Sequence, residues 1–89
     1  MAGDPGYRVV FARRAVKDVD LLSPKLREKL EGIVKNRLEV DPHSGNRLIG
    51  DLAGYRSVRL TYKDRIVYRI DDEAQVVYVV RARTHYDIP

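Results

Sequence analysis

The most constraining feature of this sequence is a set of three β-rich runs in its second half, joined by short polar links. The runs cover 55–61, 65–70 and 75–83, and each is rich in Val, Ile, Tyr and Thr. The links, 62–64 and 71–74, have the length of hairpin connections, so neighbouring runs are predicted to pair antiparallel. This pattern predicts a small sheet, and another part of the chain has to pack on one face of it to form a core.

The first half of the sequence is predicted to form one more strand and two helices that pack on the sheet. Residues 7–11 are aromatic and β-branched and predict a strand, after which the apolar residues of 12–22 recur at helical spacing. Ser23 is a favoured N-cap and Pro24 fits a first helical turn, so a second helix is predicted over 24–40. Its buried stripe comprises Leu26, Leu30, Ile33, Val34 and Leu38.

The predicted element order is therefore strand, helix, helix, strand, strand, strand. A helical hairpin packed on a small, mainly antiparallel curved sheet is an α+β fold. At 89 residues the chain has room for one core, so we expect a short flexible leader over 1–6 and a single domain over 7–89. A cluster of turn formers, 41–46, ends the second helix.

Composition excludes several kinds of site. The chain has no cysteine and only two separated histidines, which argues against a structural metal site, and no cofactor is expected. There is neither a signal-like N-terminus nor an apolar run long enough to cross a bilayer, so a soluble, cytoplasmic protein is expected. The 17 Lys and Arg exceed the 13 Asp and Glu, which is compatible with binding a polyanion.

Strand alternation places several arginines on the predicted sheet. Ser57 and Arg59 share one face of their run and Arg56 takes the other, while the last run carries Arg81 and Arg83 on the face of Val77 and Val79. The side of the sheet away from the helices is predicted to collect Arg59, Arg65 and Arg83, with Tyr and Ser between them. A β-bulge would shift any of these positions by one residue.

Two interpretations of these arginines are open. They can be ordinary solubilising residues on the open face of an antiparallel sheet. Alternatively, guanidinium groups that converge on adjacent strands repel one another unless an anion lies among them, and their planar fork suits phosphate. Neighbouring tyrosines would offer stacking surfaces for unpaired bases. The second interpretation predicts a concave site for single-stranded RNA or phosphate.

The motifs that carry this cluster resemble a known family. They read Leu48-x-x-x-Leu52-x-Gly54-Tyr55-x-Ser57-x-Arg59-Leu60-Thr61, then Arg65-Ile66-Val67-Tyr68, then Arg83-x-His85-Tyr86. Following an αα-hairpin, this pattern resembles the RelE/ParE toxin superfamily, and most closely the RelE/YoeB-type ribosome-dependent mRNA interferases. The resemblance covers nearly the whole chain and implies the RelE-like, microbial ribonuclease-type fold.

The resemblance also implies an activity. Such toxins are endoribonucleases that inhibit translation by cleaving mRNA in the ribosomal A site, where the 2′-hydroxyl attacks the adjacent phosphate. The implied partners are the ribosome, mRNA and a cognate antitoxin, without membrane or metal. The implied catalytic residues are Arg65, Arg83, His85 and Tyr86, and the implied RNA-binding residues are Arg59, Arg56, Arg81 and Ser57, with Arg81 as the alternative to Arg83.

The sequence departs from the family at the general base. Where the YoeB branch carries a glutamate, this chain has Asn46 or Arg47, and one of the two basic positions of the RelE branch is Ser57. His85 or the ribosome would then have to supply the base, unless activity is weak. The alternatives are a ParE-like inhibitor of DNA gyrase, which acts by binding, and a catalytically weak RNA-binding relative.

Overall fold

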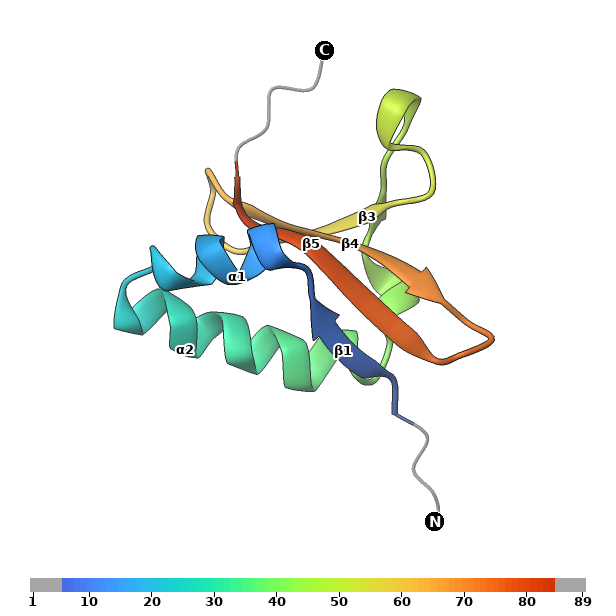
Figure 1. The fold of residues 1–89 in the computed structure, drawn as a ribbon, viewed down its shortest axis with the longest axis horizontal. Helices are drawn as coiled ribbons and strands as arrows, with labels where there is room; N and C mark the ends of the chain where they lie inside the picture. Colours follow the sequence, from blue (N-terminus) through green and yellow to red (C-terminus); the bar gives the residue numbers. More distant parts are fainter. Residues whose placement is uncertain (1–5, 85–89) are drawn as a thin grey trace.

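The computed structural model describes the backbone of residues 6–84 and side chains through residue 82, so most of the predicted leader lies outside the described residues. Figure 1 shows two helices on one side of a twisted sheet. The helices are α1 (Arg13–Asp20) and α2 (Pro24–Ile33), and a π-helical turn over Val34–Leu38 continues α2. The strands are β1 (Arg8–Phe11), β2 (Asn46–Arg47), β3 (Arg56–Arg59), β4 (Arg65–Asp71) and β5 (Val76–Thr84).

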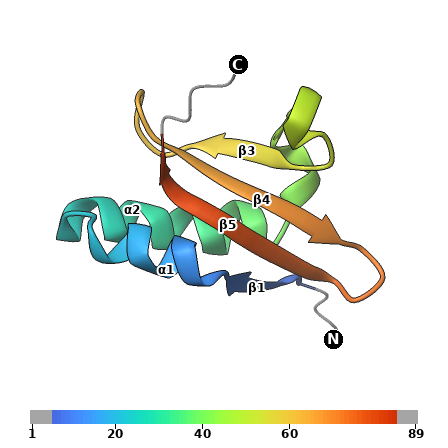
Figure 2. The same ribbon diagram turned by 45° about the horizontal axis from the view of Figure 1, so that its top comes forward.

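The sheet has the strand order β1-β5-β4-β3-β2. Only the β1–β5 pair is parallel, and the other three pairs are antiparallel, which confirms the mainly antiparallel sheet. Figure 2 shows β5 lying between β1 and β4, beside the helical layer. The first strand of the chain is therefore joined to the sheet only through β5, the strand that comes last in chain order.

The core lies between the sheet and the helical hairpin. The strands contribute alternating residues of β3, β4 and β5, and the helices contribute the stripe that faces them. These buried residues are Val58, Leu60, Ile66, Tyr68, Val77 and Val79 from the sheet side, with Ala15, Leu22, Leu30 and Leu38 from the helical side. Because Val58 and Ile66 alternate with Arg59 and Arg65, those arginines lie on the opposite side of the sheet.

The start of α2 agrees with the prediction, and its end does not. The Ser23 hydroxyl oxygen accepts a hydrogen bond from the Leu26 amide at 3.3 Å, with Pro24 in the first turn. Instead of remaining α-helical to residue 40, the chain widens into the π-helical turn, where the Glu39 amide donates to the carbonyl of Val34 at 2.9 Å. The Glu39 carbonyl accepts from the Tyr7 amide at 2.8 Å, which ties the entry of β1 to this turn.

The C-terminal half of β5 is held against α1 by hydrogen bonds to the nearly buried carboxylate of Asp18. Asp18 is 7% exposed and accepts bonds from Nε of Arg81 at 2.8 Å and Nη2 of Arg81 at 3.2 Å. The same carboxylate accepts from the backbone amide of Ala82 at 3.0 Å. This amide is available because the β4–β5 ladder shifts register twice between Arg65 and Tyr68, so β5 is bulged there.

A smaller polar cluster closes the other end of the sheet. Nε2 of His43 lies 2.7 Å from Oδ1 of Asp72, and the hydroxyl of Tyr7 donates to the same oxygen at 2.8 Å. The hydrogen bond from His43 is the main cause that lowers the pKa of Asp72, followed by the bond from Tyr7. The cluster joins the start of β1, the turn before β2 and the β4–β5 link.

Substitution of Asp72 tests this cluster through its pH dependence. Because the folded-state pKa of Asp72 lies below its ordinary value, its stabilising effect is present above the ordinary pKa and is lost as pH falls through the lowered one. We expect Asp72→Asn to be less stable than wild type near neutral pH and the difference to shrink in acid. Urea midpoints at about pH 6 and about pH 3 measure this.

The matched control is the exposed neighbour Glu73, as Glu73→Gln. An Asp72→Asn deficit of equal size at both pH values would contradict the assignment.

No helix within the described part of the chain has the length and apolar character to span a bilayer.

Candidate nucleic-acid interface

Two arginines face each other where β3 ends and β4 begins. Arg59 and Arg65 are direct register partners, and Arg65 is also paired in register with Thr84 of β5. Arg59 is exposed and Arg65 is half-buried. Like charges placed directly opposite each other destabilise an antiparallel pair, so this arrangement is unfavourable without a counter-charge.

That counter-charge is not supplied by the described side chains. Over residues 6–82 the ion pairs are His43–Asp72 and Arg81–Asp18, and neither includes Arg59 or Arg65. Two neighbouring guanidinium groups without a carboxylate form a site for an external anion, and the planar fork of arginine fits a phosphate. We call Arg59 and Arg65 the open-face arginine pair.

The other polar side chains on this face differ in availability. The guanidinium of Arg69 lies 4.3 Å from the ring centroid of Tyr78, its register partner, and is engaged in a cation–π contact. Ser57, a predicted RNA-binding residue, lies two residues before Arg59 on the same face of β3, but it is only 1% exposed. Arg59 is therefore the more accessible of the two predicted contacts on this face of β3.

The two positions at which relatives carry a base lie side by side. Of the two candidates for the glutamate position, Asn46 of β2 is the register partner of Ser57 of β3, which makes a neutral pair, whereas Arg47 is the register partner of Arg56. Sequence reasoning does not predict this juxtaposition, because Asn46 falls in a cluster of turn formers and a two-residue strand is too short to show a period. The signal available in the sequence is the family resemblance itself.

The prediction for Arg81 requires a correction. Alternation places it beside Val77 and Val79, which face the helical layer, and its guanidinium binds Asp18 on α1 there instead of lying on the open face. A nearly buried carboxylate requires a charged partner, and Arg81 provides it with two hydrogen bonds. The hydrogen bond to Asp18 is the main cause that raises the pKa of Arg81. An RNA contact by Arg81 therefore has no support in this arrangement.

Arg56, also a predicted RNA-binding residue, lies apart from Arg59. It lies on the opposite side of β3 from Arg59, as alternation predicts, and its Nη1 donates to the carbonyls of His43 at 3.1 Å and Gly45 at 3.3 Å. These bonds hold Arg56 against the turn before β2. It is not part of the open-face arginine pair.

The remaining predicted catalytic residues are only partly described. The backbone of Arg83 continues β5 between buried Ala82 and Thr84, the register partner of Arg65. His85 and Tyr86 lie outside the described residues. Over the described range, no group of three or more His, Cys, Asp or Glu side chains is arranged to hold a metal ion.

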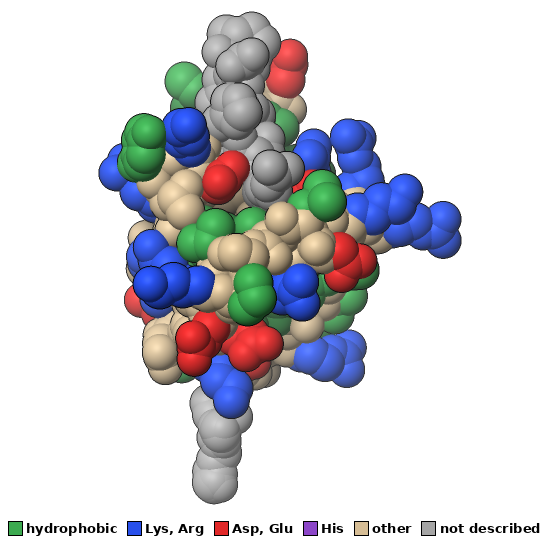
Figure 3. Space-filling model, turned by 90° about the vertical axis from the view of Figure 1, so that its left-hand side faces the viewer, with side chains coloured by type: hydrophobic (Ala, Val, Ile, Leu, Met, Phe, Trp, Pro, Cys, Tyr) green, Lys and Arg blue, Asp and Glu red, His purple; other side chains and the backbone are tan. Residues whose placement is uncertain are grey.

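Basic side chains are not confined to the open face. Figure 3, which views the molecule from the left-hand side of Figure 1, shows Lys and Arg side chains along both margins, with Asp and Glu between them. On this side of the molecule, acidic and basic side chains are therefore interspersed, within a formal net charge of +4 for the chain. Selectivity for a phosphate has to come from the local arrangement of arginines rather than from overall charge.

Solved structures that are similar to this chain include toxins and toxin–antitoxin complexes. The chain is 31% identical, with a TM-score of 0.79, to a chain of the RelBE2 toxin–antitoxin complex from Mycobacterium tuberculosis, covering 89% of this chain and 98% of that one. It is 29% identical, with the same TM-score, to a YoeB/ParE toxin from Agrobacterium tumefaciens, covering 89% and 99%. It is 28% identical, with a TM-score of 0.74, to a mutant E. coli RelE bound to an antitoxin RelB peptide, covering 91% and 85%.

A comparison with curated proteins gives no match. The family described as the ParE toxin of the type II toxin–antitoxin system, parDE, matches residues 9–89. These residues take in every described strand and helix except the first residue of β1. With its sheet, helical hairpin and family match all in agreement, the chain belongs to the ParE toxin family of type II toxin–antitoxin systems.

Proposed function

We propose that this toxin is a ribosome-dependent endoribonuclease that cleaves mRNA in the ribosomal A site. The observation that carries the proposal is the open-face arginine pair, two guanidinium groups opposed across β3 and β4 with no carboxylate partner among the described side chains. Similarity to RelE and YoeB toxins supports the same activity. Because translating ribosomes are the substrate-bearing particles, the toxin acts in the cytoplasm.

The proposed reaction is an in-line transfer within the RNA. The ribose 2′-oxygen attacks the adjacent phosphorus and gives its proton to a base, while the bond from phosphorus to the 5′-oxygen breaks. The leaving 5′-oxygen takes up a proton, so the products are a cyclic phosphate and a free 5′-hydroxyl. Arg65 stabilises the charge that develops on the phosphorane, and Arg59 holds the RNA backbone.

The residues of the chain end complete the proposed mechanism. By the family resemblance, Arg83 is the second cation on the phosphorane, and Tyr86 is the proton donor or a stacking partner for a base. Since the paired positions Asn46 and Ser57 are neutral, we assign the role of base to His85, whose side-chain type titrates near neutral pH.

The direct test is to induce the protein and map mRNA ends on translating ribosomes. We expect truncated messages with 5′-hydroxyl ends and arrested growth. Intact messages with undiminished growth would overturn the proposal. Isolated RNA is an unsuitable substrate for this test, because the proposed activity requires the ribosome to position the message.

The family match favours a second candidate, a ParE-like inhibitor of DNA gyrase that acts by binding. A supercoiling assay with purified gyrase separates the two candidates. The nuclease proposal predicts unimpaired supercoiling at toxin concentrations that cleave mRNA on ribosomes.

A cognate antitoxin is the proposed protein partner. The structures that share this fold include toxin–antitoxin complexes from two bacteria and an archaeon. A basic toxin face is complemented by an acidic segment, which would also exclude RNA from the arginine pair.

Restoring a carboxylate at the base position provides a gain-of-function test. We expect Asn46→Glu to raise the single-turnover rate of cleavage on programmed ribosomes roughly tenfold, because a positioned carboxylate can take the 2′-hydroxyl proton. Asn46→Gln is the control for size and polarity without a base. Equal rates for the Glu and Gln variants would show that position 46 does not face the reacting ribose.

A further inference from the structure

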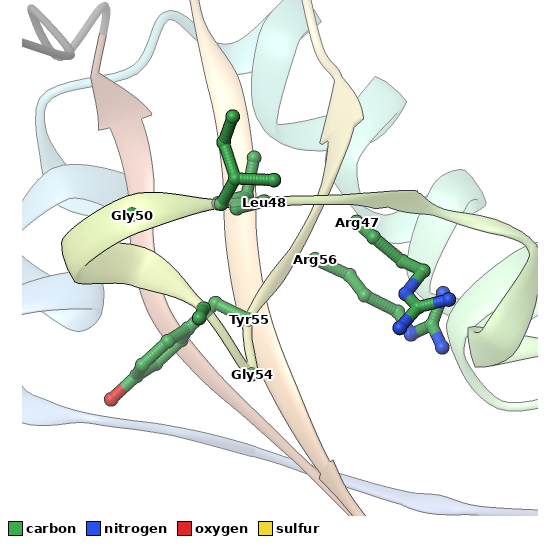
Figure 4. A pocket seen from close by; sticks show the side chains of 8 residues that line it. Arg47, Leu48, Gly50, Gly54, Tyr55 and Arg56 are labelled. Carbon is green, nitrogen blue, oxygen red and sulfur yellow. The ribbon is translucent and has the colours of Figure 1, made fainter.

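A second arginine pair lies at the β2 end of the sheet, outside the proposed catalytic site. Arg47 and Arg56 are register partners across β2 and β3, and Figure 4 shows their side chains pointing the same way. The hydrogen bonds of Arg56 go to carbonyl oxygens and it forms no ion pair among the described side chains, although the Asp72 carboxylate interacts with it electrostatically. Arg47 is exposed and has no carboxylate partner among the described side chains.

The pair borders a pocket of about 430 Å³ formed by the β2–β3 connection. Besides the arginines, its lining includes Leu48, Ile49 and Tyr55, and Figure 4 shows Tyr55 directed away from the arginine side chains. Gly50 and Gly54 have φ angles of +69° and +95°, a region that glycine adopts without strain, so the connection folds back sharply at both ends. We call this feature the Arg47 pocket.

The apolar part of the Arg47 pocket is open to solvent. Ile49 is 81% exposed, more than Leu21 of the α1–α2 link at 67% or Val16 of α1 at 46%. A single exposed apolar residue is common on protein surfaces. Ile49, however, borders a concave site that also holds two guanidinium groups without an ion-pair partner among the described side chains, and this combination suits a ligand that carries both negative charge and apolar side chains.

We propose that the Arg47 pocket binds an acidic segment with apolar side chains from a partner protein. A carboxylate would lie between Arg47 and Arg56, and an apolar side chain of the same segment would cover Ile49. Nucleic acid fits less well, because the one ring of the lining, that of Tyr55, points away from the two guanidinium groups (Figure 4) and the exposed Ile49 offers no ring for stacking. Identification of that partner as the antitoxin rests on the proposed function, whereas the chemistry of the segment does not.

The test is a titration of ¹⁵N-labelled protein with a short synthetic peptide that alternates Glu with Leu, monitored by amide chemical shifts. We expect saturable shifts confined to residues 47–56. Two control peptides replace Glu by Gln or Leu by Ser, and each should bind about tenfold more weakly, since each removes one half of the recognition. Single-stranded RNA is the competing probe and should shift amides near Arg59 and Arg65 instead.

Protein variants locate the interaction. Arg47→Ala and Ile49→Ser should each weaken peptide binding about tenfold. Arg13→Ala and Leu21→Ser are the matched controls, because both residues are exposed and lie on the helical layer, and they should bind as wild type does. Ile49→Ser should still cleave mRNA on ribosomes, because Ile49 is not part of the proposed catalytic site.

Several outcomes overturn the inference. They are the absence of saturable peptide binding, binding that is insensitive to both Arg47→Ala and Ile49→Ser, and RNA rather than the peptide shifting the amides of 47–56. The outcome for the proposed function is separate. A protein that binds the peptide at the Arg47 pocket but leaves messages intact would refute the nuclease and retain the docking site.

Discussion

Arg65→Ala is expected to reduce single-turnover mRNA cleavage on programmed ribosomes by about 10²–10³, the usual effect of removing one preorganised donor from a developing negative charge. Its guanidinium has no carboxylate partner among the described side chains and directly opposes Arg59. The substitution should therefore leave stability within about 0.5 kcal/mol of wild type, or raise it slightly by relieving repulsion. Loss of activity with an intact fold is the expected signature.

Arg69→Ala is the matched control for Arg65→Ala. It removes the same charge from the same strand and the same face, but Arg69 is engaged with the Tyr78 ring. We expect near wild-type cleavage from it. If both variants cleave equally fast, the open-face arginine pair is not catalytic. Arg65→Lys should fall between alanine and wild type, because lysine keeps the charge and loses the fork.

Asp18→Ala should have the largest effect on stability. It removes two hydrogen bonds to Arg81 and one to the Ala82 amide, and Ala82 is fully buried. The Arg81 side chain retains 34% exposure and can find water, so the cost comes mainly from the unpaired amide and the lost packing of the bulge. A loss of about 2–3 kcal/mol is expected, a large part of the total for a domain of this size.

The measurement is urea denaturation in an Arg65→Ala background, which allows the proteins to be produced if the proposed function is right. Asp20→Ala is the control, because Asp20 is exposed on the same helix. It should stay within about 0.5 kcal/mol of the background. Asp18→Asn keeps one acceptor and should lie between them. A midpoint for Asp18→Ala equal to that of Asp20→Ala would mean that the carboxylate does not hold β5.

Most helices and strands could be predicted because their apolar residues repeat with a helical or strand period over several residues. The runs over 55–61, 65–70 and 75–83 became β3, β4 and β5, and the helical stripe of 24–38 became α2 with its π-helical turn. β2 has no such signal, because two residues do not establish a period and its sequence favours turns. The π-helical turn likewise is not predicted by the helical period, and the hydrogen bond that joins it to β1, from the Tyr7 amide to the Glu39 carbonyl, is a tertiary contact.

The positions of the candidate site residues could be predicted only where the pairing of neighbouring strands is regular. Arg59 and Arg65 lie where alternation predicts, on an unshifted β3–β4 ladder. Alternation also places Arg81 beside Val77 and Val79 on the helical side, but its partner there, the buried carboxylate of Asp18 on α1, is a tertiary contact that the strand pattern does not show. That Asn46 and Ser57 lie side by side could not be predicted, because it depends on the register between β2 and β3.

The strand order has a consequence for how the toxin becomes active. β5 separates β1 from β4, so during synthesis the first strand has no neighbour in the sheet until the last strand has been made. Pairing across such a long stretch of chain is slow compared with helix formation. Thr84, which completes the row of Arg59 and Arg65, also belongs to this last strand. Under the proposed function, the site is incomplete until β5, which carries Arg83, has been made, and the ribosome that is translating the toxin is spared.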